Sequence, residues 1–309
     1  MSVIAVHDLH KRYKDTVAVA DVSFTVEPGE IFGILGRNGA GKTTTVECIT
    51  GMRKPDAGTI EVLGLDPQRD RAELRERVGI QLQASRVFDR ITVIEAMRLF
   101  ASFYTDPADP EELVALMGLS DRRDVAFSAL SGGQQQRLSV ALALVGRPEV
   151  AVLDELTTGL DPRARRDTWE VVEAIRDRGV TIVLVSHFME EVERLCDRVA
   201  ILEAGRVVGI DSPAGLVAQL GGAQRVAFTT AQPVDHDVLR ALPGVETVEA
   251  VGPEVEVTGG GELLSTVTSA LAAHRIRTDR LTSDRAGLED VFLALTGHRI
   301  SRDDVEEAA

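Results

Sequence analysis

Residues 36–44 place three glycines, a lysine and two threonines between an apolar run and a helical pattern. They read Gly-Arg-Asn-Gly-Ala-Gly-Lys-Thr-Thr and follow the apolar residues 31–35. Glycine lets a backbone curl without a side-chain clash, so successive amide groups can point at one anion. The start of the following helix adds the positive end of its dipole. The pattern predicts a phosphate loop that binds a nucleoside triphosphate and magnesium.

Positions within this loop have distinct expected roles. Lys42 is placed to reach the β- and γ-phosphates, and the Thr43 hydroxyl is placed to bind the metal. A glycine-rich turn that only caps a helix is the alternative, and it leaves the Lys-Thr pair unexplained. The nucleotide-binding residues predicted here are Gly36, Arg37, Asn38, Gly39, Ala40, Gly41, Lys42, Thr43 and Thr44.

Length and charge limit the possible classes of protein. A chain of 309 residues is long enough for one large domain or two ordinary ones. The net charge of −15 argues against a surface that attracts nucleic acid or anionic membranes. No apolar run approaches the ~20 residues that span a bilayer, and the first residues lack the pattern of a signal peptide. We therefore expect a chain that is soluble by itself and needs a partner for any membrane role.

Cysteines and histidines give no sign of a metal centre. Cys48 and Cys196 lie in apolar helical patterns, which supports neither a disulfide framework nor a zinc site and fits a reducing cytoplasm. Apart from Asp8, His7 and His10 have no acidic or cysteine residue close by in the sequence. We expect them on a solvated sheet edge.

Short apolar runs alternate with helical patterns in the first two thirds of the chain. This alternation predicts an α/β core with a parallel sheet, which we assign to residues 1–215. Apolar residues recur at helical spacing between the strand-like segments 78–82 and 150–153. We expect a helical subdomain there, over about residues 85–145.

A second pattern follows a boundary near Ser212–Gly222. Residues 225–229, 245–251 and 254–257 read as strands, and two helical faces begin at Leu263 and Leu288. The order suggests a small α+β domain over residues 222–300, with a ferredoxin-like arrangement. The charged tail, 301–309, is predicted to be disordered.

An acidic pair ends one apolar segment of the core. Asp154 and Glu155 follow residues 150–153. A carboxylate at the end of such a strand can hold magnesium opposite Thr43, and the next acid can polarise an attacking water. An ordinary strand end is the alternative when the segment is taken alone, but a preceding phosphate loop favours the catalytic interpretation.

Two further segments suit phosphate chemistry. Ser131, Gly132, Gly133 and Gln134 precede a helical pattern, where they offer an N-cap and a second phosphate-binding surface. His187 follows the strand-like segment 180–185 and can donate to a γ-phosphate oxygen. The alternatives are a simple capped loop and a structural histidine.

In this order, the motifs of residues 1–215 closely resemble the ATP-binding subunit of ABC transporters. The resemblance implies a P-loop NTPase fold, with ATP and Mg²⁺ as cofactors. It implies that Glu155 is the catalytic base, Asp154 a metal ligand and His187 the switch histidine. Two such subunits pack head to tail, so the signature segment of one, Ser131–Gln135, closes over ATP held by the other.

The same resemblance assigns three scattered residues. Gln83 matches the glutamine that contacts magnesium and faces the membrane partner, with Gln81 as a competing match. Asp161 matches an aspartate of the dimer interface. Tyr13 matches the aromatic residue that stacks on adenine, although an aromatic on an edge strand would give the same pattern.

Partners and transport class also follow from the resemblance. It implies a second ATPase subunit, in the simplest case an identical one, and an integral membrane permease, with no nucleic acid. It places the protein in the cytoplasm, on the inner face of the cell membrane. Residues 287–297 resemble the tail of the daunorubicin/doxorubicin exporter group, which tends to carry leucine, as at Leu156, where the wider family has proline. We expect an ATPase that powers export of a drug-like or hydrophobic substrate.

Two other functions stay open at this point. One is an ABC ATPase that acts on a soluble complex and never transports. The other is a binding module whose ATP site only controls assembly, although the intact Glu155 argues against it.

Overall fold

The computed structural model describes residues 2–82, 89–219, 224–230, 234–252, 254–285 and 287–297. Its contacts divide the chain into two compact units, one centred on Met1–Pro213 and the other on Ala214–Arg299. This division falls beside residue 215, where the sequence pattern changes. The tail expected to be disordered, 301–309, lies outside the described residues.

Within the described residues, the first unit is built on one nine-stranded sheet. Its strands are β1 (Ile4–Tyr13), β2 (Thr16–Val26), β3 (Ile31–Leu35), β4 (Ala57–Val62), β5 (Val78–Gln81), β6 (Val150–Asp154), β7 (Thr181–Ser186), β8 (Arg198–Glu203) and β9 (Arg206–Asp211). Their order is β4-β1-β2-β9-β8-β3-β7-β6-β5. Strands β8, β3, β7, β6 and β5 run parallel, whereas β1 pairs antiparallel with β2 and β4. The parallel core predicted from the sequence is confirmed.

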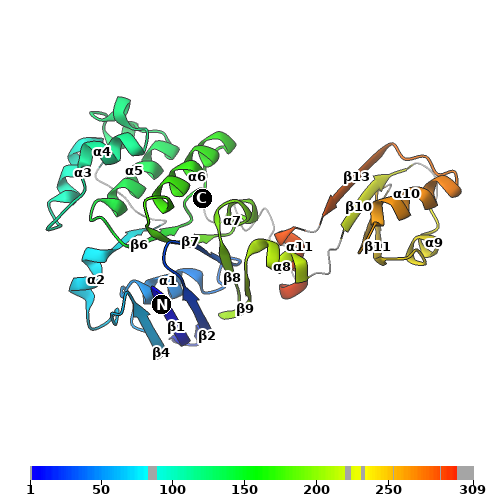
Figure 1. The fold of residues 1–309 in the computed structure, drawn as a ribbon, viewed down its shortest axis with the longest axis horizontal. Helices are drawn as coiled ribbons and strands as arrows, with labels where there is room; N and C mark the ends of the chain where they lie inside the picture. The colour runs from blue at the N-terminus through cyan, green and yellow to red at the C-terminus, as the bar shows by residue number, and fades with distance from the viewer. Residues whose placement is uncertain are drawn as a thin grey trace. The chain divides into compact units, whose positions relative to one another are not determined.

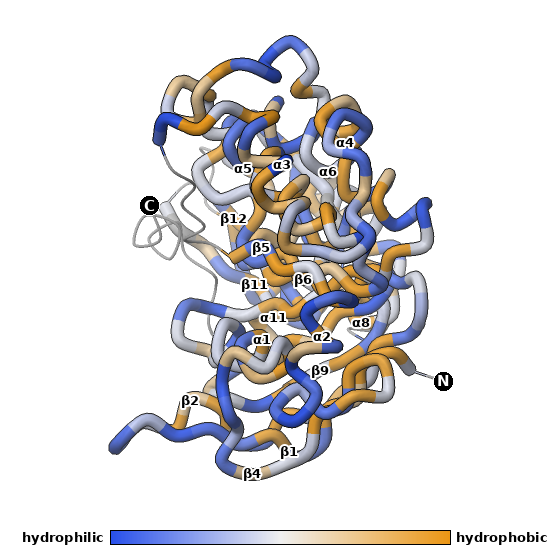
Figure 2. Tube along the Cα trace, turned by 90° about the vertical axis from the view of Figure 1, so that its left-hand side faces the viewer, coloured by the Kyte–Doolittle hydropathy of each residue, from blue (hydrophilic) through white to orange (hydrophobic). Residues whose placement is uncertain are grey.

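Three neighbouring strands of this sheet are buried along their whole length. β3, β6 and β7 read Ile-Phe-Gly-Ile-Leu, Val-Ala-Val-Leu-Asp and Thr-Ile-Val-Leu-Val-Ser. Continuous apolar runs of this kind form parallel strands that are covered on both faces. Figure 2 shows the apolar residues of β5 and β6 inside the unit and polar residues along its loops.

The register of these strands brings distant segments to one edge of the sheet. Leu35 at the end of β3 lies opposite Ser186, and Asp154 at the end of β6 lies opposite Val185. The phosphate loop, the acidic pair and His187 therefore follow three adjacent strands at the edge where open α/β sheets bind ligands.

Helices surround the sheet, and three of them lie between β5 and β6 in the chain. They are α1 (Lys42–Ile49), α2 (Arg71–Arg77), α3 (Val93–Ala101), α4 (Pro110–Leu116), α5 (Gly132–Leu144), α6 (Pro162–Arg176) and α7 (Met189–Leu195), with the 3₁₀ turns η1 (Ser120–Arg122) and η2 (Phe127–Ala129). Figure 1 shows α3, α4 and α5 gathered beside α6. Thr92 and Glu95 cap the start of α3 reciprocally, and Asp109 caps α4 just before Pro110. The polar Asp-Pro segment between α3 and α4 thus begins a helix as well as interrupting one.

The second unit contains, in its described part, a four-stranded antiparallel sheet. Its elements are α8 (Pro213–Gln219), β10 (Gln224–Thr229), α9 (His236–Arg240), β11 (Val245–Val251), β12 (Glu254–Gly259), α10 (Leu263–Ala273), β13 (Arg280–Arg285) and α11 (Leu288–Thr296). The strand order β11-β12-β10-β13 and the β-α-β-β-α-β sequence from β10 to β13 define a ferredoxin-like arrangement. Its core joins β10, β11 and β12 to α9 and α10.

Two elements of this unit differ from the sequence prediction. The sequence pattern omits β13, because Arg-Leu-Thr-Ser-Asp-Arg has one apolar residue and no apolar run. It also omits α9, which is five residues long. The helix that joins α10 in the ferredoxin-like core is therefore α9 rather than α11. The apolar residues of α11, which are Leu288, Val291 and Phe292, are buried outside this core.

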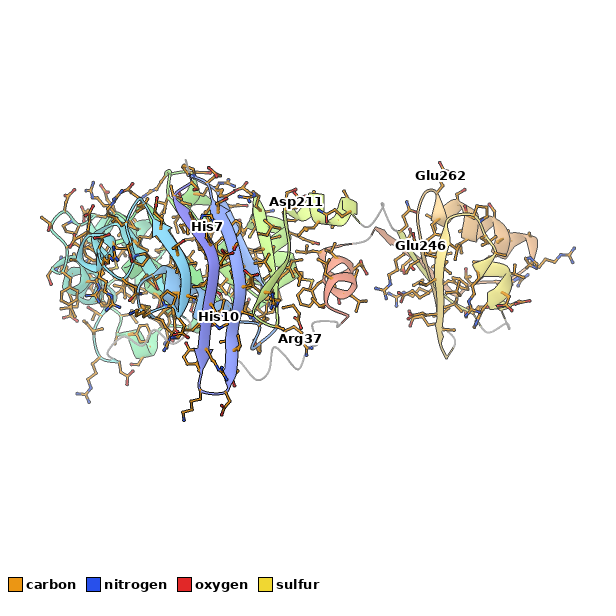
Figure 3. All side chains as sticks on the ribbon, turned by 90° about the horizontal axis from the view of Figure 1, so that it is seen from below. His7, His10, Arg37, Asp211, Glu246 and Glu262 are labelled. Carbon is orange, nitrogen blue, oxygen red and sulfur yellow. The ribbon has the colours of Figure 1, made fainter. Side chains whose placement is uncertain are left out.

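We expected the histidines of β1 on a sheet edge. They lie inside the sheet instead, because β1 is between β4 and β2. Figure 3 shows His7 and His10 projecting from this strand, and His10 Nδ1 lies 3.0 Å from the Ala20 carbonyl oxygen. Among the described residues, no group of His, Cys, Asp or Glu has the arrangement of a metal cluster. Both cysteines are free and buried. No helix in the described ranges has both the length and the apolar content to cross a membrane.

Candidate nucleotide-binding site

The phosphate loop joins the carboxyl end of β3 to the first residue of α1. Gly41 is the N-cap residue of α1, and no side chain in the described structure caps this helix. The first amide groups of a helix need acceptors from outside the helix. An external anion can serve as an acceptor for these amides, at the positive end of the helix dipole.

Glycine is required at both ends of the loop for steric reasons. Gly41 has a φ of 101°, and a Cβ there would lie 2.4 Å from the Ala18 carbonyl oxygen. A Cβ on Gly36 would lie 2.5 Å from the Leu202 carbonyl oxygen. The loop therefore packs directly on the backbones of β2 and β8, which fixes its curvature.

Lys42 folds back over its own loop. Its ammonium group donates to the carbonyl oxygens of Gly36 at 2.8 Å and Arg37 at 3.1 Å. The side chain is 5% exposed. A buried, hydrogen-bonded ammonium group is a strong partner for a phosphate oxygen, because little water competes for it.

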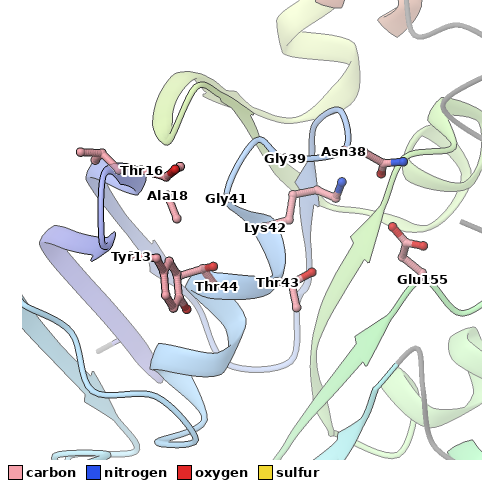
Figure 4. A pocket seen from close by; sticks show the side chains of 11 residues that line it. Tyr13, Thr16, Ala18, Asn38, Gly39, Gly41, Lys42, Thr43, Thr44 and Glu155 are labelled. Carbon is pink, nitrogen blue, oxygen red and sulfur yellow. The ribbon is translucent and has the colours of Figure 1, made fainter. Parts of the chain in front are cut away.

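A pocket of about 620 Å³ opens beside this loop and α1. Figure 4 shows Lys42, Thr43 and Glu155 around one side and Tyr13 with Thr16 around the other. Of the predicted nucleotide-binding and catalytic residues, those that line it are Tyr13, Asn38, Gly39, Gly41, Lys42, Thr43, Thr44 and Glu155. Gly36, Arg37 and Ala40 are not part of the lining described.

The sequence analysis missed three lining residues at the start of β2. Thr16, Val17 and Ala18 form the pocket wall next to Tyr13. The signal was the tight turn after Tyr13, which pairs this residue with Thr16. Val17 is 43% exposed, so it offers an accessible apolar surface next to the Tyr13 ring, against which a planar base can pack.

Asp154 lies at the end of β6 as a nearly dry carboxyl group. It is 2% exposed, and its Oδ1 has no hydrogen-bond partner among the described residues. Burial, followed by the neighbouring charge of Glu155, raises the pKa of Asp154 to about 6, against the opposing effect of Lys42. An unpaired buried carboxylate oxygen, with the Thr43 hydroxyl in the pocket nearby, fits a hard divalent cation such as Mg²⁺.

Glu155 and His187 face one another across the ends of β6 and β7. Glu155 Oε1 lies 3.4 Å from His187 Nδ1. Neither ring nitrogen of His187 has a well-aligned hydrogen bond within the described ranges. The contact with His187 lowers the pKa of Glu155 and outweighs the raising effect of burial. Glu155 is therefore an ionised acceptor at neutral pH, at the wall of the pocket.

The backbone at Glu155 is in an unusual conformation. Its φ is 51°, in the left-handed region that residues with a side chain rarely adopt. The Glu155 amide donates to the Val185 carbonyl oxygen at 2.9 Å, and Leu156 is fully buried just after it. Leu156, where the resemblance leads us to expect proline, is therefore part of the core.

The signature residues of this chain lie outside its own pocket. Ser131 is the N-cap residue of α5, and Ser131 and Gln134 cap each other reciprocally. Gly133 packs against the start of α6, because a Cβ there would lie 3.2 Å from Ala164 Cβ. Asp161 caps α6 by accepting from Arg163 and Ala164, and these backbone bonds lower its pKa. The described lining of the pocket includes neither Ser131–Gln134 nor Asp161.

Gln83 lies outside the described residues, so its predicted role has no structural test. Gln81 is described at the end of β5, opposite Leu153. It is 2% exposed, and its side-chain amide nitrogen donates to the Leu82 carbonyl oxygen at 2.9 Å.

Comparison with known proteins places this site in a family. Residues 19–158 match the family described as ABC transporter. The chain is 37% identical over 307 residues to the Nod factor export ATP-binding protein I of Ralstonia nicotianae, covering 96% of this chain and 95% of that protein. The chain belongs to the ABC transporter family, as an ATP-binding subunit. It therefore binds ATP, and it is an ATPase whose hydrolysis is coupled to transport.

Further relatives support this membership over nearly the whole chain. The protein of the same description from Burkholderia pseudomallei is 39% identical over 303 residues and covers 94% of this chain and 96% of that protein. The structure of cbiO1 from Clostridium perfringens, part of the ABC transporter complex cbiONQ, matches with a TM-score of 0.64 and 28% identity. That match covers 71% of this chain and 92% of cbiO1. The P-loop NTPase fold predicted from the sequence is confirmed.

The raised pKa of Asp154 generates a prediction for the ABC ATPase without nucleotide and metal. The free energy of unfolding should fall as the pH rises through about 6, because folding then buries an unpaired charge; below 3.8 the carboxyl is neutral in both states. Asp154→Asn removes this charge, so the free energy of unfolding of the variant should be roughly 2–3 kcal/mol higher than that of the wild type at pH 8. Urea unfolding in EDTA from pH 4 to 8 measures it. A variant less stable than the wild type at pH 8 would contradict this account.

Proposed function

We propose that this ATPase hydrolyses ATP between two paired subunits and thereby powers export of a drug-like or hydrophobic molecule through a separate membrane permease. The observation that carries the hydrolytic part is the 3.4 Å approach of Glu155 and His187 beside the Lys42 pocket. An ionised acceptor and an imidazole at the wall of a phosphate site supply the groups that hydrolysis requires.

The residues of the pocket divide the work on ATP. Lys42 and the amides of residues 36–44 bind the phosphates, and Tyr13 stacks on adenine beside Val17. Asp154 and Thr43 would hold Mg²⁺, with Gln83 as a further ligand. The bound ion would neutralise charge on the phosphates.

Glu155 and His187 act on the attacking water and the γ-phosphate. Glu155 accepts a proton from the attacking water while the water oxygen forms a bond to the γ-phosphorus. The bond from that phosphorus to the bridging oxygen breaks, which releases ADP and inorganic phosphate. His187 donates to a γ-phosphate oxygen and keeps Glu155 ionised by its contact. The pocket walls position the water in line with the leaving group.

The second half of the site comes from a second subunit, in our proposal an identical one. Ser131–Gln134 present an exposed, capped helix start, and Asp161 stands at the start of the adjacent α6. Neither segment lines the pocket of its own chain, whereas a triphosphate carries several charges that need donors from more than one side. Head-to-tail pairing brings Ser131, Gly132 and Gly133 onto the γ-phosphate of the partner.

A groove of about 580 Å³ is the proposed docking surface for the permease. It lies between the helical segment and the sheet and is lined by Ile80, Phe100, Phe103 and Tyr104, among others. Phe103 is 65% exposed and makes an edge contact with Phe100 at 5.8 Å between ring centroids. An exposed aromatic pair of this kind marks a binding surface for an apolar partner segment.

The proposed substrate class depends on the likeness to exporters. The relatives named above are described as export proteins, and residues 287–297 resemble the tail of the daunorubicin/doxorubicin exporter group. Together with Leu156, this supports export of a drug-like or hydrophobic molecule by an ATPase on the cytoplasmic face of the cell membrane. Residues 1–215 form the nucleotide-binding domain and 222–300 an accessory domain in this proposal.

Replacement of the proposed base tests the hydrolytic mechanism. Glu155→Gln should lower kcat for ATP by about 100- to 10,000-fold, because the amide cannot accept the proton from water. ATP binding should persist, and magnesium ATP should trap the variant as a dimer in size-exclusion chromatography. Glu170→Gln changes an exposed acid on α6 and serves as the matched control. Turnover of Glu155→Gln near the wild-type rate would exclude Glu155 as the base.

Loss of the exposed aromatic tests the docking surface. Phe103→Ser should reduce co-purification with the membrane permease by at least about tenfold, since a central aromatic anchor contributes about 2 kcal/mol or more. The ATPase rate of the isolated subunit should stay within about twofold of the wild-type rate, because Phe103 has no role in the pocket chemistry. Met52→Ser, at a residue 53% exposed, controls for general loss of apolar surface. Undiminished co-purification of Phe103→Ser would refute this docking surface.

A further inference from the structure

A second buried carboxyl group lies close to the catalytic pair and has no role in the proposed hydrolysis. Glu191 in α7 is 0% exposed. Its Oε1 accepts a hydrogen bond from the indole nitrogen of Trp169 in α6 at 3.1 Å. Its Oε2 is buried and has no aligned partner among the described residues. A buried carboxyl group with an unsatisfied oxygen lowers the stability of the fold, which indicates that Glu191 has another role.

Glu191 faces both segments that carry the catalytic pair. Burial raises the pKa of Glu191, and its interactions with Ser186 and Thr157 lower it. Ser186 directly precedes His187, and Thr157 follows Glu155 by two residues. Thr157 Oγ1 and Glu191 Oε2 are a buried donor and a buried acceptor, and neither has an aligned bond in the described structure.

A stack of side chains reaches the same place from α6. The Arg165 guanidinium lies 4.4 Å from the ring centre of Phe188, and this ring lies 4.1 Å from that of His187. The Arg165 amide donates to the Asp161 carbonyl oxygen at 2.9 Å. Arg165 also attracts the Glu191 carboxylate. The Phe188 ring therefore links Arg165 of α6 to the His187 ring.

We infer that Glu191 is a positioning residue, which ties α6 and α7 to the segments of Glu155 and His187 and thereby sets the distance between this pair. The inference rests on the roles proposed above for Glu155 and His187. A polar group that joins several elements in a dry interior restrains them more tightly than apolar packing does. A displacement of the base by about 1 Å can reduce turnover about 100-fold, which makes such a restraint worth its cost.

The test compares Glu191→Ala with Glu191→Gln. Glu191→Ala should lower kcat by about 10- to 100-fold and change the Kd for ATP by less than about threefold, because only the alignment of the base is lost. Glu191→Gln keeps an acceptor for Trp169 and should stay within about threefold of the wild-type kcat. Glu170→Gln, at an exposed acid of α6, is the matched control.

Trp169 provides a readout that is independent of turnover. It is the single tryptophan of the chain, so one indole N–H signal in a ¹H–¹⁵N spectrum reports its bond to Glu191. That signal should move in Glu191→Ala and stay near its wild-type position in Glu191→Gln. Should Glu191→Ala fail to fold, Thr157→Val removes only a hydroxyl and should lower kcat by about threefold or more, without moving the indole signal.

The outcomes separate this inference from the proposed function. A folded Glu191→Ala with a displaced indole signal and a wild-type kcat overturns the positioning role and leaves Glu155 as the base. A wild-type kcat in Thr157→Val overturns it where the alanine variant does not fold. Turnover by Glu155→Gln instead overturns the proposed hydrolytic mechanism, whatever the Glu191 variants do.

Discussion

The meeting of a buried strand with an uncapped helix start is the constraint on which the rest of the structure depends. β3 delivers the loop of residues 36–41 to α1, and no side chain in the described structure satisfies the first amides of that helix. Such amides can bind an anion, and the parallel sheet brings the ends of β3, β6 and β7 to the same edge. The phosphate site is therefore a product of the sheet topology as much as of the loop sequence.

Burial then separates two adjacent acids into different states. Asp154 is dry and unpaired, which raises its pKa to about 6 and suits it to a metal ion. Glu155 contacts His187, which lowers its pKa and suits it to accept a proton. Neighbouring carboxyl groups with opposite shifts can divide metal binding and base catalysis between them. Glu191 extends this arrangement into the interior, where it restrains rather than reacts.

Features that are local in sequence could be predicted, and features made by distant contacts could not. Apolar runs identify β3, β6 and β7 because central parallel strands are buried on both faces. The polar strand β13 was missed because its neighbours, rather than its own pattern, make it a strand. Thr16–Ala18 and the Trp169–Glu191 bond were missed for the same reason, since only the fold brings them to the site.

Calorimetric titration with magnesium ATP tests the central claim most directly. If Lys42 and the loop amides bind the triphosphate, Lys42→Ala should weaken the affinity by at least about tenfold, as expected for loss of a charged hydrogen bond, while Lys54→Ala should bind as the wild type does. An unchanged Kd in a folded Lys42→Ala variant would contradict the account and remove the basis for nucleotide-driven transport.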